Sequence, residues 1–302
     1  MAPSKTTKIE ETSQSFSWSN DSTESALRVL HKHESLTALR ALSHDPMLGG
    51  VPKFLDGSSQ RKWLLQHMTA VFRHWSREGY VEGMSGHISV RDPENPHAFW
   101  TNPLGVHFGL LRVSYMVLVN YEGQIIGGNQ SLPINRAGFL IHSEIHKARP
   151  DVHAVCHCHS IHGKAWSSFG RRIEMINQDA CKFFGHAHTV YETHGGVVLG
   201  AEEGERIAAV LGSSKAVILR NHGILTVGSI VDEAAWLFTS LEHSYKAQLL
   251  VEAAAANGSR VLLIDEEEAR FNFEAETDPE VCYAEFQVYY ELERRLSDGD
   301  FS

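Results

Sequence analysis

Long hydrophobic runs, basic clusters and a disulfide-forming set of cysteines are all missing from this 302-residue sequence. No apolar stretch approaches the roughly 18–20 residues that a membrane-spanning helix needs, and the first residues lack the basic and then apolar pattern of a secretion signal. A net charge of −10 argues against a nucleic-acid partner, because neutralising phosphates requires clustered Lys and Arg. We therefore expect neither a membrane nor a nucleic acid among the partners of this protein.

Cysteine is scarce in the sequence. Four cysteines are too few for a disulfide framework in a chain of 302 residues, and two of them, Cys156 and Cys158, cannot pair with each other within a strand. This composition favours a reducing, cytoplasmic setting. A hydrophobic content of 42 % is enough for one substantial globular domain with tails, or for two small domains.

Three regions of the chain differ in composition. Residues 1–57 are mostly polar and end in a stretch rich in proline and glycine, which predicts a disordered or extended arm with one short helix near 24–36. Residues 58–258 alternate short apolar strands with helices and form the predicted domain. Residues 259–302 are predicted as a C-terminal helical extension, in which a helix over 279–296 buries its aromatic residues against a neighbouring subunit.

Local signals set the expected ends of several elements in the domain. Ser59 is expected to cap a helix that runs to about Glu78. Ser229 and Asp232 resemble a capping box at the start of a long helix. A small strand is expected within residues 191–199. Short strands interleaved with helices predict an α/β layer protein.

The stretch Val152–Gly163 carries the most informative pattern in the sequence. Its apolar start predicts a buried strand that ends in His157-Cys158-His159. Because side chains alternate along a strand, His157 and His159 share one face while the cysteines point to the other. Two imidazoles at this spacing can hold one divalent cation, at roughly 2.0–2.1 Å per nitrogen for zinc. The alternative is a pair of histidines satisfied by neighbouring polar groups.

A third histidine, His222, favours the metal site over that alternative. Residues 216–219 read as a short buried strand, and His222 follows it just before a glycine that lets the chain turn sharply. Three neutral imidazoles leave coordination positions open, as in a catalytic rather than a structural metal site. Zinc is the expected metal and iron the alternative, because the ligand type alone does not select between them.

Four separated motifs resemble the class II aldolase/adducin family, in order and in spacing, over about residues 58–256. The resemblance implies a three-layer α/β/α fold with a central, mainly antiparallel sheet. It also implies a small-molecule substrate and a homotetramer whose sites lie between subunits, each with a divalent metal on His157, His159 and His222. The motifs that carry the resemblance are Gly83–Val90, Ala148–Val155, His157–Ser160 and Asn221–Gly228.

The sequence departs from the sugar-phosphate aldolases of this family at their catalytic groups. Their proton-handling glutamate stands four residues before the helix histidine that matches His142, and that position is Gly138 here. Glu144 is close in sequence, but a residue two positions from His142 on a helix should point elsewhere. Their phosphate-binding asparagine, threonine and two serines are matched here by His87, Leu104, Arg136 and Ala137.

Two segments, Pro133–Gly138 and Asn177–Cys181, are closer to an adducin-like branch of the family. That branch includes iron enzymes that cleave the side chains of aromatic 2-oxo acids oxidatively. It also includes adducin, a cytoskeletal protein on the same fold without the metal site, so the fold alone does not decide the function.

The leading hypothesis is a metal-dependent lyase that cleaves a C–C bond of a small carbonyl or carboxylate substrate through a metal-stabilised enolate. The first alternative is a mononuclear non-haem iron oxygenase that performs oxidative decarboxylation of an aromatic 2-oxo or hydroxy acid. The second is a non-enzymatic, adducin-like interaction protein.

Three residues are the candidate catalytic groups beside the metal. His87 and Arg136 could each bind a substrate carboxylate, and His87 could also shuttle protons near neutral pH. Gln178, together with Asp179, could contact the metal-bound water or orient a ligand histidine. The ordinary alternative for each of them is a turn, loop or surface position.

Overall fold

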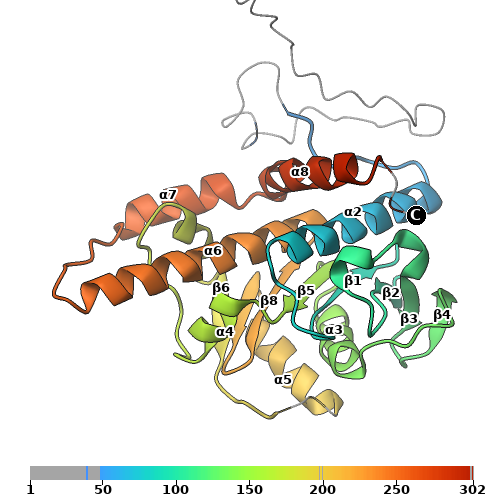
Figure 1. Cartoon of the computed structure of the whole chain (residues 1–302), viewed down its shortest axis with the longest axis horizontal. Coiled ribbons are helices and arrows are strands. Elements are labelled where there is room, and N and C mark those ends of the chain that lie inside the picture. Colours follow the sequence, from blue (N-terminus) through green and yellow to red (C-terminus); the bar gives the residue numbers. More distant parts are fainter. Residues whose placement is uncertain (1–38, 40–47, 197, 199, 300, 302) are drawn as a thin grey trace, which may run out of the picture.

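An eight-stranded sheet forms the centre of the protein (Figure 1). The structure is a computed structural model that describes residue 39 and residues 48–196, 198, 200–299 and 301. Most of the predicted arm, including its short helix near 24–36, therefore lies outside the described residues.

The strand order in the sheet is β4-β3-β2-β1-β5-β8-β7-β6. Neighbouring strands are antiparallel except β6 and β7, which are parallel. The prediction of a central, mainly antiparallel sheet is confirmed. The strands are β1 (His87–Arg91), β2 (Ala98–Thr101), β3 (Val117–Asn120), β4 (Ile125–Gly128), β5 (Ala154–Cys158), β6 (His188–Tyr191), β7 (Ala216–Leu219) and β8 (Gly223–Gly228).

Helices cover both faces of this sheet, which gives the three predicted layers (Figure 1). On β5, Cys156 and Cys158 face a core shared with α2, α6 and α8, while Val155 faces a second core shared with α3 and α5. The helices are α2 (Gly57–Arg77), α3 (Arg136–Ala148), α4 (Ile161–Ser167), α5 (Ala201–Leu211), α6 (Val231–Ala255), α7 (Glu266–Glu276) and α8 (Pro279–Leu296).

Two of the predicted helix caps differ in the structure. Asp56, rather than Ser59, caps α2, and its Oδ1 accepts a hydrogen bond of 2.7 Å from the backbone N–H of Ser59. At the start of α6, the carboxylate that accepts from the backbone of Ser229 belongs to Glu233 and not to Asp232. Asp232 turns into the core instead, where it is 0 % exposed.

Strand β6, His188–Tyr191, pairs in register with β7 and reaches only the first residue of the segment 191–199, in which a small strand was expected. Residues 197 and 199 of that segment lie outside the described residues. The chain then continues without regular structure in the described residues up to α5. None of the described helices has the length and hydropathy to cross a membrane.

Helix α8 packs on its own chain, which corrects the expectation that its aromatic residues need a neighbouring subunit. Phe286 is fully buried in the core shared with α2 and α6. The ring of Tyr290 stacks on His67 at a centroid distance of 3.9 Å, and that of Tyr289 stacks on His74 at 4.1 Å. Figure 1 shows α8 lying along α2 and α6 on the outer side of the molecule.

Candidate metal centre

The sheet brings His157 and His222 to one end of two adjacent strands. His157 is the fourth residue of β5 and pairs with Leu225 of β8. His222 lies in the tight connection between β7 and β8, where Leu219 and Gly223 are already paired. A hydrogen bond of 2.9 Å from the backbone N–H of His222 to the carbonyl of Leu219 closes this turn.

Three histidine rings converge at this end of the sheet. Candidate ligand nitrogens of His157, His159 and His222 all lie within 4.8 Å of one another. The ring centroids are 4.9–5.2 Å apart, and the Nε2 atoms of His159 and His222 are separated by 3.0 Å. Two nitrogens bound to one tetrahedral zinc would be about 3.3 Å apart.

The hydrogen bonding of His157 prepares its Nε2 atom for a metal. Its Nδ1 atom lies 2.8 Å from the carbonyl oxygen of Ile224, and a carbonyl only accepts, so Nδ1 carries the proton. The lone pair of the neutral ring is then on Nε2. A backbone carbonyl that fixes a ligand histidine in this way is a common feature of metal sites. The donor set therefore fits a divalent transition metal.

The electrostatics of the cluster favour neutral, ligating imidazoles. Burial, followed by the neighbouring histidines, lowers the pKa of His157 well below its usual value of 6.5. The same causes lower the pKa of His222 to about 4. Burial, and then Lys164, lowers the pKa of His159. Neutral imidazole is the form that binds metal, so these ligands need not lose protons at neutral pH.

A buried carboxylate holds the chain just after His159. Glu242 of α6 is 1 % exposed and accepts hydrogen bonds from the Ser160 hydroxyl at 2.6 Å and from the backbone N–H groups of His162 at 2.8 Å and Gly163 at 2.6 Å. These N–H groups lie in the first turn of α4 and have no partner within the helix. Glu242 therefore fixes the segment that leads out of the metal-binding cluster.

His87 lies beside the triad on the neighbouring strand. It is the cross-strand partner of His157, and the two ring centroids are 5.0 Å apart. Its Nδ1 atom is 2.9 Å from Nε2 of His142 on α3. A Cβ atom built on Gly138 would overlap the His87 ring, 2.6 Å from Cγ and closer still to Nε2, so the ring fills the space in front of residue 138.

Residues 66–249 match the family described as the Class II Aldolase and Adducin N-terminal domain. The chain belongs to this family. The sequence prediction of the family and of its three-layer fold is thus confirmed. A solved structure, the L-fuculose 1-phosphate aldolase from Glaciozyma antarctica PI12, superposes with a TM-score of 0.75 at 39 % identity and covers 83 % of this chain and 96 % of that one.

Relatives in the family carry different names. The chain is 47 % identical over 211 residues to the meiotically up-regulated gene 14 protein of Schizosaccharomyces pombe, covering 70 % of this chain and 81 % of that protein. It is 38 % identical over 219 residues to a 4-hydroxy-3-prenylphenylpyruvate oxygenase/4-hydroxy-3-prenylbenzoate synthase of Streptomyces roseochromogenus, covering 72 % and 78 %. The alpha-adducin of Rattus norvegicus is 31 % identical over 206 residues, which are 68 % of this chain but only 28 % of that protein.

The other sequence candidates occupy different surroundings. Arg136 is the exposed first residue of α3, the helix that carries Gly138 and His142. Gln178 is exposed and donates its amide to Glu276 of α7. Within one chain this contact leads to the opposite face of the sheet from His157, so any role of Gln178 in the site stays a prediction.

Two acidic candidates form ion pairs with lysines outside the triad. Asp179 is exposed and forms an ion pair of 2.8 Å with Lys182. Glu144 pairs with Lys147 at 2.7 Å along α3, in agreement with the expectation that it does not face the site.

Sequence reasoning missed several residues that support this member of the aldolase and adducin family. Ser89, His146, Arg91 and Glu242 were not singled out, although a signal existed for the first two. Ser89 stands two positions after His87 on a strand and therefore shares its face, and His146 stands one helical turn after His142. The contact of Glu242 with α4 joins residues about eighty positions apart, and no local spacing in the sequence predicts it.

Proposed function

We propose that this protein is a metal-dependent lyase that cleaves a C–C bond in a small carbonyl or carboxylate substrate. The convergence of the imidazoles of His157, His159 and His222, with Nε2 of His157 left free by its bond to a backbone carbonyl, is the observation that carries this proposal. When bound there, a divalent metal supplies a Lewis acid that stabilises negative charge on a substrate oxygen as the bond breaks.

The residues around the triad would bind and orient the substrate. Arg136 at the start of α3 combines a positive charge with the positive end of a helix dipole, a suitable partner for a carboxylate. His87 of β1 lies against Gly138, two residues after Arg136 on α3. This arrangement would hold a carboxylate on one side of the reacting bond and the metal on the other.

An oxygen-dependent reaction is the second candidate. Two relatives, each 38 % identical over 219 residues, are named as a 4-hydroxy-3-prenylphenylpyruvate oxygenase and as a decarboxylase. Three histidines with open positions suit iron as well as zinc. In this alternative the substrate is an aromatic 2-oxo or hydroxy acid, and oxidative decarboxylation replaces simple bond cleavage.

We also propose that the protein acts in the cytoplasm as a homotetramer with its site completed at a subunit interface. All four cysteines are unpaired and buried, as expected in a reducing compartment. Large apolar side chains remain exposed near the end of α6, in the segment that follows it and on α7; they include Leu250, Leu262 and Phe271. Light scattering would give the oligomeric state directly.

Elemental analysis of the protein isolated without chelator tests the metal site. Wild type should hold about one divalent metal ion per chain, and His157→Ala should hold none. His153→Ala is the matched control, because His153 lies just before the same strand but is exposed. Metal-free wild-type protein that takes up no zinc or iron would sink the enzymatic proposal and favour an interaction protein.

A screen of 2-oxo and 3-hydroxy acids, with and without oxygen, separates the two reactions. A lyase should consume its substrate at the same rate under nitrogen. If the iron-loaded protein takes up oxygen as it consumes the substrate, the lyase proposal is wrong and the oxygenase proposal is supported.

A further inference from the structure

A buried chain of hydrogen bonds runs from His87 away from the metal-binding cluster. Nδ1 of His87 meets Nε2 of His142 at 2.9 Å, and Nδ1 of His142 meets the hydroxyl of Ser89 at 2.7 Å. The same hydroxyl lies 2.8 Å from Nε2 of His146, whose Nδ1 is 3.3 Å from the carbonyl oxygen of Val152. The four side chains are 0–6 % exposed.

The last contact of this chain fixes the positions of its protons. The carbonyl of Val152 only accepts, so the proton of neutral His146 is on Nδ1 and its Nε2 is an acceptor. Ser89 must then donate to His146 and accept from Nδ1–H of His142. That leaves Nε2 of His142 as an acceptor, to which Nδ1–H of His87 donates.

We propose that Ser89, His142 and His146 are positioning residues that hold His87 as the Nδ1–H tautomer, so that its Nε2 lone pair accepts a hydrogen bond from a substrate hydroxyl next to the triad. Nε2 of His87 lies against Gly138, and both residues line a small cavity in front of α3 together with Thr101 and Asn135. Its volume of about 10 Å³ suits a group the size of a hydroxyl. An acceptor in this place selects a hydroxyl over a second carbonyl oxygen.

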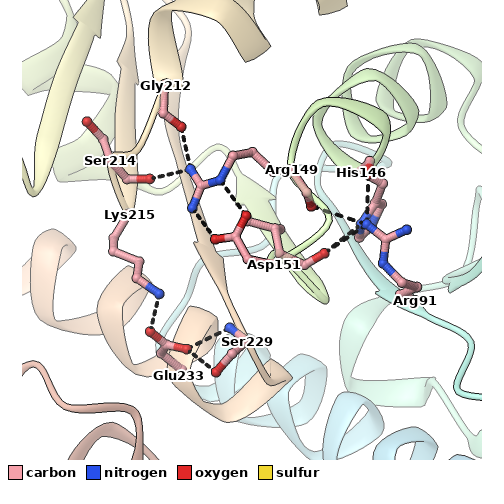
Figure 2. A network of polar contacts seen from close by, with 10 residues as sticks. Arg91, His146, Arg149, Asp151, Gly212, Ser214, Lys215, Ser229 and Glu233 are labelled. Carbon is pink, nitrogen blue, oxygen red and sulfur yellow. Dashed lines mark hydrogen bonds and ion pairs between the residues drawn. The ribbon is translucent and has the colours of Figure 1, made fainter. Parts of the chain in front are cut away.

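The far end of the chain shows why it orients His87 rather than conducts protons. Arg91 donates to the carbonyl of Val152 at 3.1 Å. It also donates to the carbonyl of His146 at 2.7 Å (Figure 2). A proton passed along the chain would end on His146, near the permanent positive charge of Arg91. No carboxylate of the described residues contacts the His146 ring to receive it. Burial, and then Arg91, lowers the pKa of His146 to about 3.

The network around Arg91 makes this far end rigid. Arg149, whose carbonyl also accepts from Arg91 at 3.3 Å, binds both Asp151 oxygens and the carbonyls of Gly212 and Ser214 (Figure 2). The carbonyl of Val152, which sets the tautomer of His146, is therefore held by Arg91, and Arg149 binds the side chain of the preceding residue, Asp151.

A neutral acceptor at His87 also decides where a carboxylate can lie. Two lone pairs facing each other repel, so Nε2 of His87 would disfavour a carboxylate oxygen. The substrate carboxylate then belongs on the side of Arg136. His87 thus acquires a role different from the carboxylate binding expected of it at the outset.

Nitrogen NMR of histidine-labelled, metal-free full-length protein tests the tautomer without any turnover. The signal of His87, assigned by its loss in His87→Gln, should report a protonated Nδ1 and a bare Nε2. In Ser89→Ala, or in Ser89→Cys should the first variant fold poorly, the proton should redistribute to Nε2. Ser143→Ala, a buried serine of α3 outside the chain, should leave the signal unchanged. A wild-type proton on Nε2 overturns the proposal by itself.

Binding of matched acids to the zinc-loaded protein tests the substrate contact, which rests on the proposed function. Mandelate and phenylglyoxylate differ only in presenting a hydroxyl or a carbonyl oxygen. Their affinity ratio should shift about tenfold toward phenylglyoxylate in Ser89→Ala, the effect of one hydrogen bond. If the affinity ratio in Ser89→Ala stays within about twofold of the wild-type ratio, the proposed hydrogen bond between His87 and the substrate hydroxyl is wrong. If neither acid binds to the wild-type protein, that result counts against the proposed function. The NMR test of the His87 tautomer does not depend on that outcome.

Discussion

The ring of His87 occupies the volume into which any side chain at Gly138 would grow. The two residues come from different layers, one from β1 of the sheet and the other from the first turn of α3. The family resemblance had implied a glutamate at the position of Gly138 and an asparagine at that of His87. The two positions are coupled in the structure, because the His87 ring fits only where residue 138 has no side chain.

This coupling predicts an unusual response to Gly138→Ala. Alanine in a helix is ordinarily more stable than glycine by about 1 kcal/mol. Here the new Cβ would overlap a buried ring, and overpacking costs about 1–3 kcal/mol. We expect the overlap to dominate, so that thermal unfolding occurs at a lower temperature in Gly138→Ala than in wild type.

The double variant His87→Ala/Gly138→Ala distinguishes overlap from other causes. Removing the ring should restore the helix preference of alanine, so the double variant should be more stable than His87→Ala alone. Equal losses from Gly138→Ala in both backgrounds would show that the two residues do not compete for the same space.

Glu242 should affect metal binding although it touches no metal ligand. Glu242→Ala leaves two backbone N–H groups of α4 and the hydroxyl of Ser160 without their partner, at a cost of about 3 kcal/mol. Because Ser160 directly follows His159, zinc affinity should fall about 10–100-fold. Calorimetric zinc titration measures this effect.

The matched control for this prediction is Glu252→Ala on the same helix. Glu252 pairs with Arg171 at 2.6 Å near the surface, and such pairs are worth less than about 1 kcal/mol. Unchanged zinc affinity in Glu242→Ala, alongside a large loss of stability, would show that Glu242 supports the fold without positioning the ligand.

Much of the fold could be predicted from local patterns. The helix expected over 279–296 has those bounds in the structure, because Pro279 opens it and its apolar periodicity runs unbroken. The same pattern could not show which surface covers its aromatic residues. Periodicity reports that a face is buried, whereas the partner of Phe286 depends on how α2 and α6 pack.

For the candidate site, too, local patterns predicted which residues take part but not how they pack together. The strand predicted to end at His159 was expected to place His157 and His159 on one side, and a glycine turn marked His222. In the structure β5 ends one residue earlier, at Cys158. The contacts of His87 with His142 join a strand to a helix that lies more than fifty residues later, and no local spacing encodes such packing. For that reason Gly138 read as a missing group in the sequence, although in the structure it makes room for a ring.

Phe286 should be the main anchor of α8. It is fully buried between α2 and α6, so Phe286→Ala should lower the free energy of unfolding by about 3–5 kcal/mol. Val288, two positions further along the same helix, is 62 % exposed, and Val288→Ala should change stability by less than about 0.5 kcal/mol. Denaturant titration of both variants measures the difference. Similar small losses in the two variants would mean that α8 is not an integral part of the core.

The buried His74 should make the metal-free protein less stable in acid. It stacks on Tyr289, and burial, followed by His243 and Arg77, lowers its pKa from 6.5 to about 4. Between these two pH values the unfolded chain binds more protons than the folded one, so stability rises with pH across this window and is lost as pH falls toward 4. One such group contributes a slope of about 1.4 kcal/mol per pH unit.

Urea titrations of metal-free wild type and His74→Gln between pH 4 and pH 6.5, the window of this shift, measure its contribution. The variant is expected to start from a lower stability at neutral pH, because the stack on Tyr289 is weakened. The free energy of unfolding of the variant should nevertheless fall less steeply with decreasing pH. The difference in slope should be at most about 1.4 kcal/mol per pH unit, the contribution of one proton. The slope, and not the absolute stability, isolates the titration, since lost packing shifts every point of the curve alike. Parallel curves for the two proteins would assign the acid sensitivity to other buried histidines, such as His188, whose pKa burial lowers to about 4.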